Sequence, residues 1–164
     1  MTARRRTLQL AILAFSIACV GGISPAQENP ASRWDELARS VTIHRDEWGV
    51  PHIFGPSDSS VVFAHLYAQA EDNFWQVEEN FILATGRAAE VHGEEALPGD
   101  VLVRALEVRR LSIEEYERSG PRMRELCDAF AGGLNYFLAK NPAIKPRLLK
   151  RFEPWHVFAF CRYG

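Results

Sequence analysis

The chain has 164 residues, of which 47% are hydrophobic and 24% charged, and its formal net charge at pH 7 is −2. This length is enough for one ordinary domain, and the composition is typical of a globular protein rather than a disordered one. Because binding to phosphates needs a basic face, the net negative charge argues against nucleic acid as a partner.

The first residues have the pattern of a secretory signal peptide. Three consecutive arginines precede an apolar run over residues 8–20, and small residues precede a cleavage site between Ala26 and Gln27. The run is too short to span a bilayer comfortably, which disfavours a membrane anchor, and Cys19 matches a lipobox only loosely. Cleavage would remove three arginines and no acid, so the formal charge would move from −2 to −5. We therefore expect residues 1–26 to be removed on export, leaving a periplasmic or secreted chain without a membrane segment.

A β-hairpin is predicted over residues 41–54. Apolar and polar residues alternate there on either side of a short loop at Trp48 and Gly49. Pro51 has no N–H for a ladder, so the second strand should pair on one side only near that residue. A hairpin alone is marginal in water and needs a larger sheet or a helix to cover it. Residues 27–40, which precede the hairpin, are polar and mixed, and we expect a disordered or extended lead-in.

The strongest periodic signal predicts a long helix between Ser57 and Gly86. Ser57 and its neighbours offer N-cap oxygens, and Gly86 is a suitable C-terminal stop. Apolar residues recur at spacings of three and four, which places them on one stripe. The stripe consists of Phe63, Tyr67, Ala70, Phe74, Val77, Phe81 and Ala84. Trp75, Ile82 and Leu83 lie off the stripe, so the second half of the helix should be contacted on more than one side.

The regular spacing of apolar residues becomes less clear after this helix. Residues 87–100 are interpreted as a loop with a helical turn, and residues 100–111 fit either a helix or a strand. Ser112 and Glu115 have the spacing of a capping box, which predicts a short helix over residues 113–118.

A second amphipathic helix is predicted from Pro121 to about Asn141. Proline is tolerated in the first turn of a helix, and the apolar spacing of three and four returns. Its apolar face consists of Met123, Cys127, Phe130, Leu134 and Phe137. Gly132 and Gly133 in its middle cost about 1 kcal/mol each relative to alanine, so another backbone should pass close to them.

The last stretch, residues 156–163, is almost wholly apolar, and the sequence stops at Gly164. A natural domain seldom finishes on such a run without a cap or a polar tail. We interpret residues 41–164 as a partial domain that is truncated at its C-terminus.

No side chains form a recognisable catalytic or metal-binding motif. The histidines lack H-E-x-x-H spacing, no acidic run matches a calcium loop, and there is no G-x-S-x-G, P-loop or G-x-G-x-x-G motif. Adjacent acids on a helix do not face each other, so we interpret the acidic pairs as solvated surface. These pairs are Glu71-Asp72, Glu78-Glu79, Glu94-Glu95 and Glu114-Glu115. We assign no catalytic residue and no metal ligand, and the substrate-binding residues remain unknown.

Three single residues can be interpreted in two ways. His52 could be a ligand or a base, but a hydrogen-bonded structural role is favoured on a strand flanked by apolar residues. Asp46 could pair locally with Arg45. Cys127 lies on the apolar face of its helix, which favours a buried thiol over a nucleophile. With Cys161 it could form a disulfide after export, or both could remain buried thiols, and the sequence leaves both states open.

Three stretches resemble successive landmarks of the penicillin acylase family. They are RDEWGVPHIFG from Arg45, AHLYAQAEDNFWQVEENFILATGRAAEVHG from Ala64, and RFEPWHV from Arg151, in the order of the family. Together they cover most of residues 41–157. The tract RALEVRRLS between them resembles the branch that includes aculeacin and acyl-homoserine-lactone acylases.

The resemblance implies an α+β fold, here the N-terminal fragment of the four-layer αββα fold of N-terminal nucleophile (Ntn) hydrolases. Family members are exported precursors that cleave themselves into an α-chain and a longer β-chain, whose N-terminal serine is the nucleophile. The α-amino group of that serine has a pKa of about 7.7–8.0 and can accept a proton near neutrality. The implied activity is hydrolysis of linear amide bonds in acylated amines such as penicillins, lipopeptides or acyl-homoserine lactones.

This sequence contains no Gly-Ser, Gly-Thr or Gly-Cys dipeptide, so the resemblance places the nucleophile in a β-chain partner encoded downstream of Gly164. No cofactor is expected in this chain, whereas calcium is possible in the full-length protein. The family residues that line the acyl pocket, and the calcium-binding glutamate, also fall beyond Gly164. The chain alone is therefore predicted to be inactive. The alternative is a non-catalytic secreted helical protein that retains the acylase scaffold and binds a partner through its apolar face.

Overall fold

The structure, a computed structural model, describes residues 30–164. The predicted signal peptide and its cleavage site at Ala26 and Gln27 lie outside these residues. The elements are α1 (Pro30–Ser40), β1 (Thr42–Arg45), β2 (Pro51–Phe54), α2 (Asp58–Ala84), α3 (Ala89–His92), a 3₁₀ turn η1 (Glu94–Ala96), α4 (Leu97–Ala105), α5 (Val108–Arg118), α6 (Pro121–Lys140) and α7 (His156–Tyr163). One hairpin and mostly helices are consistent with an α+β fragment, and the four-layer arrangement stays a prediction.

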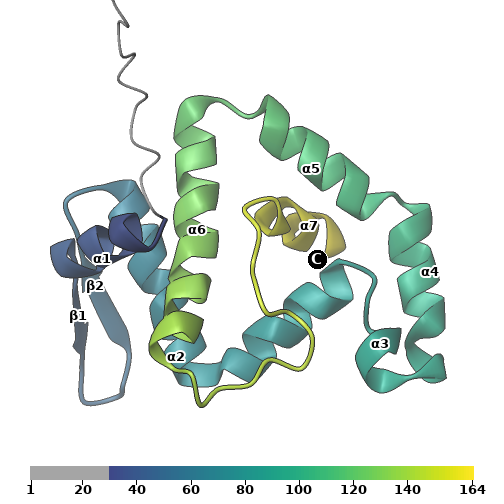
Figure 1. Ribbon diagram of the computed structural model, residues 1–164, viewed down its shortest axis with the longest axis horizontal. Helices are drawn as coiled ribbons and strands as arrows, with labels where there is room; N and C mark the ends of the chain where they lie inside the picture. Colours follow the sequence, from purple (N-terminus) through teal and green to yellow (C-terminus); the bar gives the residue numbers. More distant parts are fainter. Residues whose placement is uncertain (1–29) are drawn as a thin grey trace, which may run out of the picture.

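The helices α2 and α6 pack against each other, and most of the core lies at their interface. In Figure 1, α2, α3, α4, α5 and α6 run around α7, which contacts α2, α5 and α6. The hairpin and α1 lie at the opposite side of α6 from α7. Among residues 30–164, no helix is both long enough and apolar enough to cross a membrane.

The core between α2 and α6 is built mainly from the two predicted stripes, although Met123 at the start of α6 is nearly half exposed. The rings of Phe74 and Phe137 stack with their centroids 5.7 Å apart, and Phe81 meets Phe152 edge to face at 5.5 Å. Ile82, off the stripe, is fully buried, which confirms that α2 is contacted on more than one side. Aromatic pairs of this kind add about 0.5–1.5 kcal/mol each beyond their burial.

The predicted close approach at the glycine pair of α6 is confirmed. A Cβ added to Gly133 would lie 2.2 Å from the carbonyl oxygen of Phe63, and one added to Gly132 would lie 2.8 Å from Nε1 of Trp34. Only glycine lets the backbone of α2 come this near to α6. The propensity lost inside α6 is therefore offset by the packing of the two central helices.

The ends of α2 agree with the sequence. The Ser57 hydroxyl accepts a hydrogen bond from the Ser60 amide, and the Ser60 side chain bonds back to the cap. Gly86 has φ +66 and follows the last turn, so it provides the predicted stop. The sequence did not indicate the break at Asn73, whose backbone leaves helical geometry and whose side chain accepts from the Gln76 amide at 3.3 Å.

The hairpin is confirmed, with Ile43 paired to Ile53 and Arg45 to Pro51. Its two strands form a sheet of their own, with no further strand in the part of the chain that the structure describes. Trp48 and Phe54 are largely exposed. The apolar side chains of the hairpin are therefore incompletely covered, as expected from its marginal size.

The disordered or extended lead-in predicted for residues 27–40 is wrong over residues 30–40, because these form α1. Contacts with α6 stabilise this helix, and the apolar spacing of the sequence does not indicate them. The Asp35 carboxylate accepts hydrogen bonds from the Tyr136 hydroxyl at 3.0 Å and from Nζ of Lys140 at 3.1 Å. A helix this short depends on such tertiary contacts.

The region after α2 is more helical than predicted. Apart from the turn at Leu106 and Glu107, residues 100–111 belong to the helices α4 and α5. The capping box at Ser112 and Glu115 is wrong because α5 begins at Val108. Ser112 is fully buried inside α5, and its hydroxyl has no hydrogen-bond partner among the described residues. Glu107, with φ +53, makes the sharp turn between the two helices.

Candidate functional site

The side chain of Glu78 binds the backbone of residues 147–149, which belong to the segment that leads from α6 to α7. This carboxylate is fully buried. One oxygen accepts hydrogen bonds from the amides of Leu148 and Leu149 at 2.8 and 2.9 Å, and the other accepts from the Arg147 amide at 3.0 Å. The interpretation of the pair Glu78-Glu79 as solvated surface is therefore wrong for Glu78. Carboxylate–amide hydrogen bonds of this kind are about twice as strong as neutral ones.

The side chain of Asn135 holds the same segment against α6 by two further hydrogen bonds. The Asn135 side-chain amide donates to the Phe152 carbonyl at 2.8 Å, and its oxygen accepts from the Phe152 amide at 2.9 Å. The hydrogen bonds of Glu78 and Asn135 therefore hold the connection between α6 and α7 at two points. This connection leads to α7, which lies inside the ring of helices in Figure 1 and also packs against α2 and α5.

His156, at the start of α7, is buried and structural. Its ring stacks on Phe81 at 5.7 Å between centroids, and Nδ1 accepts from the Glu153 amide at 3.3 Å. Burial, together with the positive charges of Arg109 and Arg87, lowers the pKa of His156 to about 4. The ring is therefore neutral near pH 7 and packs as part of the core.

The stability of the chain should fall in acid because of His156. Its pKa is about 4 in the folded chain and near 6.5 when exposed. As the pH falls, His156 therefore takes up its proton in the unfolded chain before it does so in the folded chain. The contribution of neutral His156 to the free energy of unfolding is fully present above pH 6.5, and about 2–3 kcal/mol of it is lost by pH 4. Urea unfolding between pH 7 and pH 4 should show a steeper loss for the wild type than for His156→Gln. Parallel curves for the two proteins would contradict this.

The other face of α7 is open. Phe160 and Tyr163 are each nearly half exposed, and Cys161 beside them is exposed. These residues and the apolar side chains of the hairpin are two surfaces that the described residues do not cover. Such surfaces are typical of contacts with another polypeptide.

Asp46 and His52 close the hairpin rather than form a catalytic pair. Asp46 accepts hydrogen bonds from the Trp48 and Val50 amides, both at 2.9 Å, and contacts Nε2 of His52 at 3.0 Å. The hydrogen bond from His52 lowers the pKa of Asp46. The suggested pairing of Asp46 with Arg45 does not form, because Arg45 bridges Glu71 and Asp72 on α2. The contact with Asp46 supports the structural role favoured for His52.

Both cysteines are free thiols, so the disulfide is not formed in this structure. Cys127 is buried, and burial raises its pKa to about 11, which makes it a poor nucleophile. Cys161 is exposed, contrary to the interpretation of two buried thiols.

The two thiols should differ strongly in reactivity. Iodoacetamide added to the folded chain is expected to alkylate Cys161, whereas Cys127 should react only after denaturation. Peptide mapping by mass spectrometry distinguishes the two sites. A disulfide-linked peptide containing both cysteines, or equal labelling in the folded chain, would contradict the structure.

The described residues do not assemble a reaction centre. Within residues 33–164 no serine or cysteine donates a hydrogen bond to a histidine, and within residues 30–164 no three potential metal ligands come together. Ser59 donates to Glu125 at 2.8 Å, but this contact ties the start of α2 to α6. The geometry is that of a scaffold with two uncovered apolar surfaces.

Comparison with known proteins identifies the scaffold. Residues 40–163 match the family model described as penicillin amidase. The chain belongs to the penicillin amidase family. Penicillin acylase 2 proenzyme from Pseudomonas sp. (strain SE83) is 34% identical over 132 residues, which are 77% of this chain and 17% of the relative. Aculeacin-A acylase from Actinoplanes utahensis is 30% identical over 154 residues, covering 86% of this chain and 19% of that protein.

Other relatives include acyl-homoserine lactone acylase QuiP from Pseudomonas fluorescens Pf-5, 35% identical over 102 residues, which are 62% of this chain and 13% of the relative. These proteins confirm the resemblance to the penicillin acylase family and to its aculeacin and acyl-homoserine-lactone branch. The chain spans less than a fifth of the length of these relatives.

A solved structure of thermostable penicillin G acylase from Alcaligenes faecalis has a similar fold, with a TM-score of 0.65 and 22% identity. The match covers 74% of this chain and 69% of that chain. At this identity the comparison supports the fold alone. The sequence did not predict the structural role of Glu78. The signal for its burial is its position among apolar neighbours on α2.

Proposed function

We propose that this chain is the N-terminal, α-chain portion of an exported acylase precursor. In this proposal it works with a longer β-chain whose N-terminal serine attacks the amide carbonyl, with its own α-amino group as the base. The reaction is hydrolysis of a linear amide bond in an acylated amine. The penicillin, acyl-homoserine lactone and aculeacin-A acylases named among the relatives define the range of candidate substrates.

The observation that carries this proposal is the match of residues 40–163 to the penicillin amidase family. The uncovered apolar side chains support it, because Trp48, Phe54, Phe160 and Tyr163 would be buried by a partner chain. The role of the described residues is then to hold α7 and the hairpin in place for that partner. Calcium, if the complete enzyme binds it, would be held mainly by the β-chain, and the complex would act in the periplasm or outside the cell.

Reading the gene beyond the codon for Gly164 tests the proposal. We expect the frame, or a frame shifted by one, to continue for several hundred codons and to contain a Gly-Ser dipeptide that starts a β-chain. A stop codon followed by unrelated sequence would overturn the proposal. It would favour the alternative of a non-catalytic secreted protein that keeps the scaffold.

A further inference from the structure

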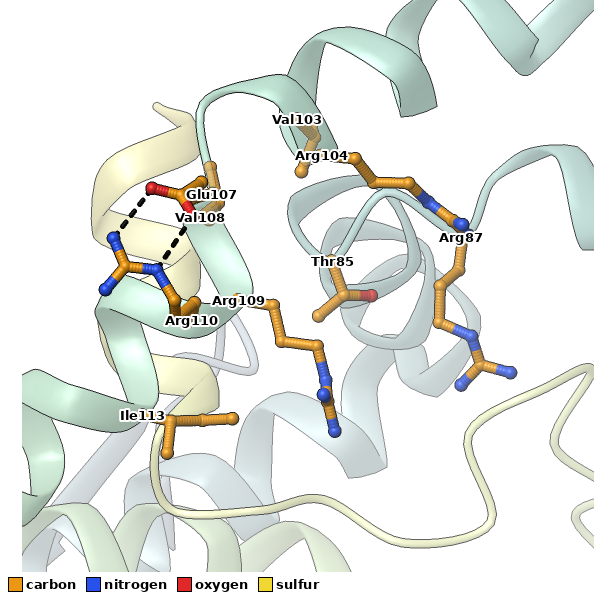
Figure 2. A pocket seen from close by; sticks show the side chains of 9 residues that line it. All are labelled: Thr85, Arg87, Val103, Arg104, Glu107, Val108, Arg109, Arg110 and Ile113. Carbon is orange, nitrogen blue, oxygen red and sulfur yellow. Dashed lines mark hydrogen bonds and ion pairs between the residues drawn. The ribbon is translucent and has the colours of Figure 1, made fainter.

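A cleft of about 680 Å³ lies between the end of α2 and the helices α4 and α5 (Figure 2). This volume is within the range of about 300–1,000 Å³ that is usual for small-molecule sites. The lining includes four arginines, Arg87, Arg104, Arg109 and Arg110, and only one acid, Glu107. The cleft is therefore strongly basic although the whole chain has a formal charge of −2.

Two of the four arginines are neutralised and two are not. Arg87 is held by Glu90 in a bidentate ion pair at 2.7 Å, and Arg110 pairs with Glu107 at 2.7 Å and with Glu114. In the part of the chain that the structure describes, no carboxylate pairs with Arg104 or Arg109. The spare positive charge of the cleft is therefore carried by these two side chains.

The two spare guanidinium groups are oriented by other contacts. Arg104 donates through Nε to the Gly86 carbonyl at 3.0 Å, which leaves its terminal N–H groups available. Arg109 lies over the ring of Trp155 at 5.4 Å from the centroid. In Figure 2 Arg104 extends from α4 toward Arg87, whereas Arg109 extends from α5 into the space below Thr85. Both line the cleft, and Arg109 is the one whose guanidinium group reaches into its open part.

The remaining wall of the cleft is apolar. Val103 and Val108 line it and are buried, and Ile113 projects into it from α5. An inorganic anion would leave these side chains unused, whereas a carboxylate with an attached apolar group would contact them and the arginines together. Arginine binds carboxylates through two parallel hydrogen bonds, which suits this geometry.

We propose that the cleft lined by Arg109, Val103, Val108 and Ile113 binds a carboxylate joined to an apolar group. The Arg109 guanidinium group holds the carboxylate, and the apolar wall receives the tail. This inference rests on the cleft alone and does not depend on the proposed acylase activity.

Octanoate is a suitable probe, titrated into the full chain as recovered after export and followed by NMR of the arginine side chains and by calorimetry. We expect octanoate to bind, octylamine not to bind, and acetate and inorganic phosphate to bind more weakly. Arg109→Gln should weaken octanoate binding about tenfold, because it removes a charge-assisted bidentate contact. Arg109→Lys keeps the charge and should lie between the wild type and Arg109→Gln.

Arg110→Gln is the matched control, since Arg110 lines the same cleft but is already paired with Glu107 and Glu114. It should change the affinity for octanoate by less than about twofold. Circular dichroism of each variant shows whether the fold is kept. Absence of octanoate binding, equal binding to the wild type and Arg109→Gln, or phosphate binding as tight as octanoate would each overturn the proposal.

Discussion

Replacing Glu78 by alanine is expected to lower the free energy of unfolding by about 3–5 kcal/mol, because buried amides lose a charged acceptor and a cavity is left. The amides are those of Arg147, Leu148 and Leu149, all within 3.0 Å of the carboxylate. Urea unfolding followed by circular dichroism measures the change. The loss should be large because nothing else among the described residues accepts from these three donors.

The neighbouring Glu79 provides a matched control. Its carboxylate pairs with His92 and with the Arg147 side chain and is partly exposed. Glu79→Ala should cost less than about 1 kcal/mol, since ion pairs near the surface contribute little. If Glu78→Ala and Glu79→Ala were equally stable, the fastening role of Glu78 would be wrong.

Replacing Gly133 by alanine is expected to cost about 3 kcal/mol, the upper range for forcing an extra carbon into a packed interior. The new Cβ would lie 2.2 Å from the Phe63 carbonyl oxygen, so the backbones of α2 and α6 would have to separate. Thermal and urea unfolding should both report the loss. Gly132→Ala should cost less, because it meets the Trp34 side chain, which can move.

Gly99→Ala is the control for a helical glycine without a close neighbour. No atom lies within 4 Å of the Cβ that it would add. Alanine is favoured over glycine in a helix by about 1 kcal/mol, so this variant should be as stable as the wild type or slightly more stable. Equal stability of Gly133→Ala and Gly99→Ala would show that α2 and α6 do not approach each other as described.

The sequence was most informative where structure is locally determined. The cap at Ser57, the stop at Gly86 and the stripes of α2 and α6 were predictable, because a helix repeats its contacts every three or four residues. The glycine pair at 132–133 predicted a close backbone. The hairpin followed from alternation and its loop.

The rest depends on partners far away in the chain. Helix α1 forms where Asp35 meets Tyr136, a residue 101 positions further on. Glu78 resembles any surface acid until the amides of residues 69–71 positions later converge on it. No pattern of period two or 3.6 encodes such contacts.

The cleft lined by arginines illustrates the same limit. The sequence shows Arg104, Arg109 and Arg110 in one basic tract, but not which of them are neutralised. In the folded chain Arg110 forms an ion pair with Glu107, whereas the guanidinium group of Arg109 stacks over the ring of Trp155. Side chains that look equivalent in the sequence therefore have different roles in the fold.

In the proposed function this chain is a scaffold, and its catalyst comes from a partner chain. The most direct test is a turnover measurement with the chain alone, purified from a host that lacks acylases. Penicillin G and an acyl-homoserine lactone are the substrates, and the released amine is quantified. We predict no release above the blank at any chain concentration. Release that rises in proportion to chain concentration would contradict the claim.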